Sequence, residues 1–246
     1  MPLLQVSGLS KSFGGLTAVS RVDFSVEQGQ VLSIIGPNGA GKTTIFNLIT
    51  GYLKPSAGQV VFDGQNITGR PTHAIARLGI GRTFQVVQPL ENLSVLENAM
   101  LGAFAHTSSK RLAEAQAGEI LEFTGLDRDR HRLARELTLA SRKRLEIARA
   151  LAIRPKLILL DEVVAGLNPT EAEETIGLLR RLPERGVSAV AGVEHVMRVV
   201  MSLSDEVVVL DHGEKIAQGK PEVVARNPRV IEAYLGKEYH QQEVMS

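Results

Sequence analysis

The fold expected of this chain is decided by the stretch Gly36-Pro37-Asn38-Gly39-Ala40-Gly41-Lys42-Thr43-Thr44, which matches the phosphate-loop pattern G-x-x-x-x-G-K-S/T. Glycines let the backbone curl until consecutive N–H groups point at a polyphosphate, and a Cβ on Gly39 or Gly41 would obstruct that approach. Lys42 adds a mobile positive charge. The hydroxyl of Thr43 suits a Mg²⁺ ion that bridges two phosphates, because hard cations prefer oxygen ligands.

The segments on either side of this loop fit a strand and a helix. Residues 31–35, Val-Leu-Ser-Ile-Ile, are typical of a buried strand, and residues 43–50 indicate a helix. The positive N-terminal end of such a helix faces the bound anion. This context favours phosphate binding over a glycine turn that binds nothing.

Composition limits the classes of protein that remain. The chain has 246 residues, 28 basic and 27 acidic side chains, a net charge of +1 and no cysteine. Its length permits one large α/β domain, and we expect a single domain over residues 1–246. The missing cysteines exclude a disulfide framework and a thiolate zinc site. The balanced charge gives no long-range attraction to nucleic acid, so no nucleic-acid partner is expected.

The sequence contains no apolar stretch long enough to cross a bilayer. Residues 1–6 lack the basic region and apolar run of a targeting signal. We therefore expect a cytoplasmic chain without direct membrane insertion. Any attachment to a membrane would have to come through a protein partner.

Short alternating runs precede and follow the phosphate loop. Residues 4–7 and 22–26 predict an antiparallel hairpin region that is polar on one face, and residues 59–64 predict a strand closed by an Asp-Gly turn. Phe13 stands between two turn signals. It either packs in the core or offers a flat ring on which an adenine stacks.

The middle of the chain has a helical character. Residues 72–78 predict a helix and residues 79–85 a return to extended structure. Over residues 96–154 an all-helical insert is expected, with periodic apolar positions at Leu112, Ile120, Leu121, Leu133 and Leu137. Within it, residues 127–132 alternate in charge and indicate a solvated face or loop. A further helix is expected to start near Ser141.

A continuous apolar run at residues 157–160 ends in Asp161 and Glu162. This is the pattern of a buried parallel strand with acids at its carboxyl end. Asp161 suits the Mg²⁺ ion held by Thr43, and Glu162 could orient or deprotonate an attacking water. A helix cap or surface turn is the ordinary interpretation of such a pair. The apolar strand and the phosphate loop favour the catalytic interpretation.

Strands and helices continue to alternate towards the C-terminus. Residues 170–182 predict a helix, residues 187–193 a strand that leads to His195, and residues 206–210 a strand before a turn. This order predicts a mostly parallel, doubly wound α/β sheet with the site at its strand ends. His195 could contact the γ-phosphate or the water there, or be an ordinary surface or core histidine.

Together these residues resemble the nucleotide-binding subunit of an ABC transporter over nearly the whole chain. The resemblance implies a P-loop NTPase core with a mostly parallel sheet, an N-terminal antiparallel β region and a helical subdomain inserted at about residues 96–154. It also implies ATP and Mg²⁺ as cofactors, integral-membrane permease subunits, and a second ATP-binding subunit facing the first head to tail. Such a chain would lie on the cytoplasmic face of the cell membrane.

The family motifs match individual positions of this sequence. Phe13 matches the adenine-stacking aromatic, and residues 36–44 match the Walker A loop, in which Lys42 serves catalysis. Gln85 matches the Q-loop glutamine that senses Mg²⁺ and the membrane subunit.

The acidic half of the site matches as well. Residues 157–161 resemble Walker B, with Asp161 as a metal ligand, and Glu162 matches the catalytic glutamate. Residues 165–168, Ala-Gly-Leu-Asn, match the D-loop, and His195 matches the switch histidine.

Three further segments resemble the ATPases of branched-chain or hydrophobic amino-acid uptake systems: residues 81–85, 144–149 and 230–236. They favour an importer of such amino acids. An export-type ABC ATPase remains an alternative, as does a nucleotide-binding partner with little activity of its own. A soluble regulatory or repair ATPase would usually show a second cassette or a coiled-coil arm, and the sequence shows neither.

One motif departs from the family. Where the signature L-S-G-G-Q is usual, this chain has Leu137-Thr138-Leu139-Ala140-Ser141, with neither glycine. Leu139 should hold the loop back from a γ-phosphate, because close backbone approach needs small residues. Arg142, Lys143 and Arg144 then add positive charge, or simply form a solvated helix start. In a heterodimer with a normal paralogue, the site on this chain's phosphate loop should hydrolyse ATP and the opposite site should be impaired.

Overall fold

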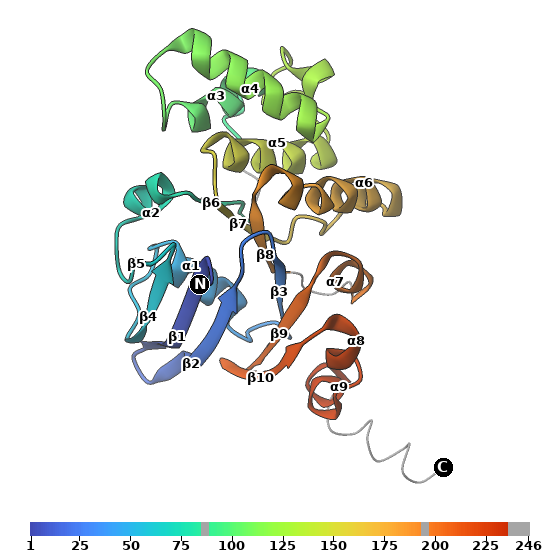
Figure 1. The fold of residues 1–246 in the computed structure, drawn as a ribbon. Coiled ribbons are helices and arrows are strands. Elements are labelled where there is room, and N and C mark those ends of the chain that lie inside the picture. The colour runs from blue at the N-terminus through green and yellow to red at the C-terminus, as the bar shows by residue number, and fades with distance from the viewer. Residues whose placement is uncertain (85–88, 193–196, 236–246) are drawn as a thin grey trace. The chain divides into compact units, whose positions relative to one another are not determined.

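The computed structural model (Figure 1) describes residues 1–84, 89–192 and 197–235. The chain divides into two compact units: residues 1–72 with residues 190–246, and residues 73–189. The helical part expected over residues 96–154 lies within the second unit.

An antiparallel sheet forms the N-terminal part of the first unit. Strand β1 (Leu4–Phe13) pairs with β2 (Leu16–Val26) and β4 (Ala57–Phe62), and β5 (Gln65–Asn66) completes the order β2-β1-β4-β5. Asp63 and Gly64 join β4 to β5 with φ angles of 48° and 74°, the left-handed pair that a tight hairpin turn requires. The predicted antiparallel region and its Asp-Gly turn are confirmed.

The phosphate loop follows a buried strand of the first unit. Strand β3 (Val31–Ile35) is buried along its whole length and pairs in parallel with β9 (Glu206–Asp211). Strand β10 (Glu214–Gly219) adds an antiparallel edge to β9. Helix α1 (Lys42–Ile49) begins inside the loop sequence, so the predicted strand, loop and helix are confirmed.

Three further helices of this unit come from the C-terminal part of the chain, drawn in orange and red in Figure 1. They are α7 (Met197–Leu203), α8 (Pro221–Val224) and α9 (Pro228–Leu235). Prolines at the starts of α8 and α9 fit the helix N-terminus, where the missing N–H costs no hydrogen bond. Strand β8 (Ser188–Gly192) crosses the boundary between the units along the chain.

The second unit contains its own parallel strand pair. Helix α2 (Thr72–Leu78) leads into β6 (Ile80–Arg82), which pairs in parallel with β7 (Leu157–Asp161). All five residues of β7 are buried, as an apolar run in a parallel sheet predicts. Helix α6 (Pro169–Arg180) and a 3₁₀ turn at Pro183–Arg185 follow it.

Three helices, α3 (Val95–Ala103), α4 (Lys110–Thr124) and α5 (Leu139–Ala152), pack together in the second unit. Two 3₁₀ turns, Asp127–Asp129 and Ala134–Glu136, connect α4 to α5. The helices approach closely, since a Cβ on Gly102 would lie 2.6 Å from the Cβ of Ala152. Small residues at the contact make this helical packing possible.

One detail of the helical expectation is wrong, and the structure moves one expected helix start by two residues. Leu112 is 55% exposed, because α4 turns the face carrying Ala113, Ala117 and Leu121 inward instead. Helix α5 begins at Leu139, two residues before the expected start near Ser141, because Thr138 caps it. Ile120, Leu121 and Leu137 are buried, so the apolar periodicity identified most of the inward positions and failed at Leu112.

The run of alternating charge at residues 127–132 forms a locally paired turn, as expected for a solvated loop. Asp127 pairs with Arg130 at 3.3 Å, and Asp129 pairs with Arg132 at 2.8 Å. Among the residues that the structure describes, none of the helices combines the length and apolarity needed to cross a membrane.

Candidate functional site

Glycines shape the phosphate loop in two different ways. A Cβ on Gly36 would lie 2.1 Å from the carbonyl oxygen of Leu210, and one on Gly41 would lie 2.7 Å from that of Ala18. Gly39 meets no protein atom within 4 Å, so its requirement is a left-handed backbone, with φ of 82°. Protein atoms therefore exclude a side chain at Gly36 and at Gly41. At Gly39 a side chain would meet no protein atom, so the predicted obstruction there would be of a bound phosphate.

Helix α1 leaves its first N–H groups open. Its N-cap is Gly41, in the left-handed conformation with φ of 103°, and no side chain caps the helix. A hollow of about 160 Å³ lies at this end, lined by Ala18 and by residues 39–44. Uncapped N–H groups at a helix N-terminus are suited to binding a phosphate.

The side chain of Lys42 folds back across the loop. Its Nζ donates to the carbonyl oxygens of Gly36 at 2.7 Å and Pro37 at 2.9 Å. Thr43 is exposed at the first turn of the same helix. The ammonium and hydroxyl that the sequence predicted for phosphate and metal therefore both belong to the start of α1.

Phe13 is the last residue of β1 and its side chain is 46% exposed. The Nζ of Lys11 lies 5.1 Å from the centre of its ring. This exposure rules out core packing, one of the two interpretations of the sequence. Adenine stacking stays a prediction.

The C-terminal helix α9 lies beside the phosphate loop, a feature that the sequence did not predict. A hollow of about 570 Å³ is lined by residues 37–40, the β9–β10 hairpin and α9. The N–H of Gly36 donates to the Tyr234 hydroxyl, and burial nevertheless raises the pKa of Tyr234 to about 12. The loop is therefore packed against the end of the described chain.

Asp161 ends β7 as a buried carboxylate in the second unit. Its Oδ2 lies 3.3 Å from Nη2 of Arg82, and its backbone N–H donates to Oγ1 of Thr83 at 3.0 Å. Sequence analysis did not assign Arg82 or Thr83 to the site. Their place at the carboxyl end of β6, the neighbour of β7, is the signal that could have identified them: Arg82 is the last residue of that strand and Thr83 follows it.

Glu162 has an unusual backbone. Its φ is 50°, in the left-handed region that non-glycine residues rarely adopt. Its carbonyl oxygen accepts hydrogen bonds from Nζ of Lys143 at 2.6 Å and from the N–H of Ala165 at 3.2 Å. Strained backbone of this kind often marks functional residues.

Lys143 is buried, with 6% of its surface exposed, so the expectation of a solvated helix start is wrong for this residue. Burial lowers the pKa of Lys143, and the negative charge of Glu162 opposes that shift. Lys143 lies one turn into α5, where its side chain reaches Glu162, the residue after β7. The charged run Arg142-Lys143-Arg144 contains no pattern that would indicate this contact.

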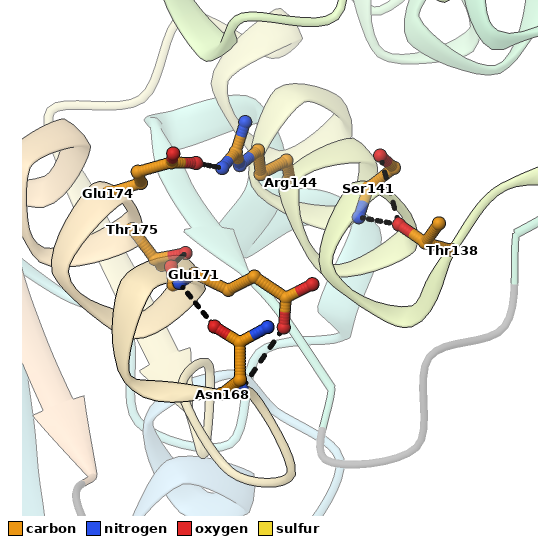
Figure 2. A network of polar contacts seen from close by, with 7 residues as sticks. All are labelled: Thr138, Ser141, Arg144, Asn168, Glu171, Glu174 and Thr175. Atoms are coloured by element: carbon orange, nitrogen blue, oxygen red, sulfur yellow. Dashed lines mark hydrogen bonds and ion pairs between the residues drawn. The ribbon is translucent and has the colours of Figure 1, made fainter.

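The signature segment, residues 137–141, forms an ordinary capped helix start. The N–H of Ser141 donates to Oγ1 of Thr138 at 3.2 Å, and the Thr138 hydroxyl donates to that of Ser141 at 3.3 Å (Figure 2). Leu139 is 48% exposed, and its Cδ2 would lie 3.3 Å from a Cβ on Gly166. The hydroxyls of Thr138 and Ser141 are thus engaged with each other.

The D-loop segment, residues 165–168, leads directly into helix α6, and its last residue, Asn168, is the N-cap of that helix. The side chain of Asn168 accepts from the N–H of Glu171 at 3.0 Å, and the carboxylate of Glu171 accepts from the N–H of Asn168 at 3.1 Å. Figure 2 shows this capping box beside the ion pair of Arg144 and Glu174, which joins α5 to α6.

The phosphate-binding residues belong to the first unit, and Asp161, Glu162 and the signature segment belong to the second. Gln85 and His195 lie outside the described residues, so their predicted roles stay predictions. Among the described residues, no group of three or more His, Cys, Asp or Glu side chains could hold a metal ion.

Comparison with known proteins gives two family matches. The model described as ABC transporter matches residues 19–165, and the model described as branched-chain amino acid ATP-binding cassette transporter matches residues 214–240. A similar curated protein is the high-affinity branched-chain amino acid transport ATP-binding protein BraF of Pseudomonas aeruginosa. It is 42% identical over 251 residues, covering 96% of this chain and 98% of the relative.

Solved structures agree with these matches. The ADP conformation of MJ1267, an ATP-binding cassette of an ABC transporter, is similar with a TM-score of 0.87 and 35% identity, covering 96% of this chain and 100% of that one. The dimeric post-hydrolysis state of the ATP-binding cassette MJ0796, bound to ADP and Pi, has a TM-score of 0.79 and 27% identity, covering 89% of this chain and 98% of that one.

The comparisons confirm the predicted fold: a P-loop NTPase of the ABC type, with an antiparallel N-terminal sheet and a helical subdomain. They also confirm that the chain binds nucleotide as an ABC ATPase, which hydrolyses ATP to drive transport. Because both family models match it and a relative aligns with it over nearly the full length of both, this chain belongs to the ABC transporter family, among the ATP-binding proteins of branched-chain amino acid transport.

Proposed function

We propose that ATP hydrolysis by this chain drives the uptake of branched-chain or other hydrophobic amino acids through integral-membrane permease subunits. The observation that carries the substrate class is the family match at residues 214–240, which span β10, α8 and α9. The identity with BraF over nearly both full lengths supports it. The chain would bind the cytoplasmic face of the cell membrane through the permease.

The phosphate loop and the start of α1 hold the nucleotide phosphates in this proposal. The open N–H groups at Gly41 and the ammonium of Lys42 supply the positive charge. Thr43, Asp161 and Gln85 would hold Mg²⁺, and Phe13 would stack on the adenine. The donor set fits magnesium, because a hydroxyl, a carboxylate and an amide oxygen are hard ligands. When bound, the ion neutralises charge on the transferred phosphoryl group.

Glu162 is the residue proposed to prepare the attacking water, and His195 is proposed to contact the γ-phosphate or that water. Glu162 follows Asp161 directly, so one buried strand end places a metal ligand and a base next to each other. Phosphoryl transfer to water needs positioning and charge neutralisation more than covalent chemistry. One positioned carboxylate is enough for the base.

A second ATP-binding subunit, identical or paralogous, completes the assembly in this proposal. The dimeric state of MJ0796 supports it, since that cassette is similar to this chain. The signature segment favours asymmetry, because Thr138 and Ser141 bond to each other and Leu139 replaces a glycine. The site on this chain's phosphate loop would then hydrolyse ATP, while the site that receives this chain's signature segment would be impaired.

Reconstitution with the permease and each catalytic glutamate inactivated in turn tests this function. Glu162→Gln is expected to lower ATP turnover and the uptake of leucine, isoleucine and valine by about 10²–10⁴, the usual loss for a positioned base. The matching change in the partner subunit should cost far less. Unchanged turnover in Glu162→Gln would contradict the role of Glu162, and ATP turnover without amino-acid uptake would contradict the substrate class.

A further inference from the structure

The charged run at the start of α5 contains one side chain that is not solvated. Lys143 is 6% exposed, while its neighbours Arg142 and Arg144 keep more contact with water. A buried ammonium is unfavourable unless its N–H groups find acceptors. The acceptor here is the carbonyl oxygen of Glu162, 2.6 Å from Nζ. A buried charge is thus directed at the backbone of the proposed catalytic residue.

That carbonyl belongs to a residue in a disfavoured conformation. Glu162 has a φ of 50°, although it carries a full side chain. Such conformations persist only where the surroundings fix them. Two donors fix this one, Nζ of Lys143 and the N–H of Ala165, and both bind the same oxygen. The residue before it is also held, since Asp161 bonds to Thr83 and Arg82.

Three residues in the first turns of α5 contact the segment that follows β7. Leu139 lies against Gly166, Lys143 bonds to Glu162, and Arg144 pairs with Glu174 on α6, the pair drawn in Figure 2. The outer two contacts join α5 to the D-loop and to α6. Of these three contacts, the bond from Lys143 is the one made to Glu162 itself.

We propose that Lys143 is a positioning residue for Glu162. Its ammonium holds the Glu162 carbonyl, keeps the backbone in the left-handed conformation, and so sets the direction in which the glutamate side chain leaves the chain. The proposal rests on the catalytic role proposed above for Glu162. It gives Lys143 no contact with nucleotide or water.

The first test compares three variants in the reconstituted transporter. Lys143→Met keeps the length of the side chain and removes its charge and donors. It is expected to lower kcat for ATP by about 10- to 100-fold, because misplacing a reacting group by about 1 Å costs that much. KM for ATP should change little. Lys143→Arg, which keeps a charged donor, should restore most of kcat, and Lys110→Met, at an exposed lysine of the same unit, should change neither constant.

Nucleotide affinity, measured by equilibrium titration on each variant, shows whether the protein remains folded. If Lys143→Met does not fold, Lys143→Gln keeps a neutral donor and is expected to give an intermediate kcat. A normal kcat in Lys143→Met or Lys143→Gln would overturn the proposal. So would a failure of Lys143→Arg to recover activity while it binds nucleotide normally.

A double-mutant cycle separates positioning from general support of the fold. If Lys143 acts through Glu162, then Lys143→Met should cost nothing further in a Glu162→Gln background, because the group it positions is already lost. Equal losses in both backgrounds would overturn the role of Lys143 alone. Full turnover in Glu162→Gln would remove the role of Glu162, and the proposal for Lys143 with it.

Discussion

Helices α1 and α5 both begin at loops that ABC proteins place near phosphates, yet the two helix starts are built differently. At α1 the N-cap is Gly41 and no side chain takes the first N–H groups. At α5 the N-cap is Thr138, whose hydroxyl accepts from the N–H of Ser141. A helix start can bind an anion only with the N–H groups that its own side chains leave open. The start of α1 is therefore open, as an anion site requires, whereas the start of α5 is capped by its own Thr138.

The same contrast holds for the neighbouring backbone. The phosphate loop uses Gly36, Gly39 and Gly41, all with positive φ, and two of them stand against carbonyl oxygens. The signature segment has no glycine, and Leu139 lies against Gly166 of the D-loop instead. A loop that must approach a ligand with its backbone needs glycine, whereas a loop that only starts a helix does not.

The largest expected effect comes from breaking the open helix start. In Gly41→Ala the new Cβ would lie 2.7 Å from the carbonyl oxygen of Ala18, at a φ of 103° that L-residues avoid. The loop must shift, and the N–H groups lose their alignment with the phosphates. We expect ATP affinity to fall about 100-fold, equivalent to about 2.7 kcal/mol, which equilibrium titration of the purified chain would measure.

Gly186→Ala is the matched control for this change. Gly186 also has a positive φ, 71°, but a Cβ there meets nothing within 4 Å. It should lower stability by about 1–2 kcal/mol through backbone strain and leave ATP affinity unchanged. Equal affinity losses in the two variants would show that general strain, and not the phosphate loop, controls binding.

Much of this contrast could be predicted from the sequence, and the reason is local. The spacing of Gly36, Gly41 and Lys42 specifies a backbone path with few alternatives, and the apolar run 157–160 specifies a buried strand. Both requirements act within a few residues of the motif. The family comparisons then confirmed the fold that these segments predicted.

The rest depends on contacts between residues far apart in the sequence. Lys143 looks like any basic residue at a helix start, and only the placement of α5 against the end of β7 buries it. Arg82 meets Asp161 because β6 pairs with β7. Tyr234 reaches Gly36 across almost the whole chain. No periodicity or spacing contains this information.

Removing the cap of α5 should have the next largest effect. Thr138→Val keeps the shape of the side chain and removes the hydroxyl that accepts from Ser141. The expected loss of stability is about 1 kcal/mol, the typical value for an N-cap, or roughly 2–4 °C in Tm. Thermal unfolding followed by circular dichroism would measure it.

Thr138→Ser keeps the hydroxyl and should retain the wild-type Tm. The pair of variants also tests the comparison of the two helix starts. If Thr138→Val were as stable as wild type, the Thr138 hydroxyl would not be an effective cap. The first N–H groups of α5 would then be as available to a ligand as those of α1.

Placing glycines in the signature segment should make the start of α5 more similar to the start of α1. The double change Leu139→Gly and Ala140→Gly removes the side chain that lies against Gly166 and allows close backbone approach. If this chain's signature is what impairs one of two sites, turnover of the reconstituted complex should rise, by at most about twofold, since one further site joins the reaction. A steady-state ATPase assay measures the change, and an unaltered or lower turnover with normal nucleotide binding would contradict the asymmetry.

The smallest effect concerns the outer side of the phosphate loop, where the N–H of Gly36 donates to Tyr234. Burial raises the pKa of Tyr234 to about 12 in the folded chain, against about 10 for an unfolded tyrosine. The folded state therefore favours the neutral hydroxyl. Its contribution to stability is fully present below pH 10 and is lost as the pH rises from 10 towards 12.

Tyr234→Phe cannot ionise, so the urea midpoint of this variant should fall less steeply above pH 10 than that of wild type. Tyr52→Phe, at an exposed tyrosine of the same unit, should leave the wild-type slope unchanged. Parallel slopes for Tyr234→Phe and wild type would mean that the α9 hydroxyl is not buried against the loop, and that the loop depends on its glycines alone.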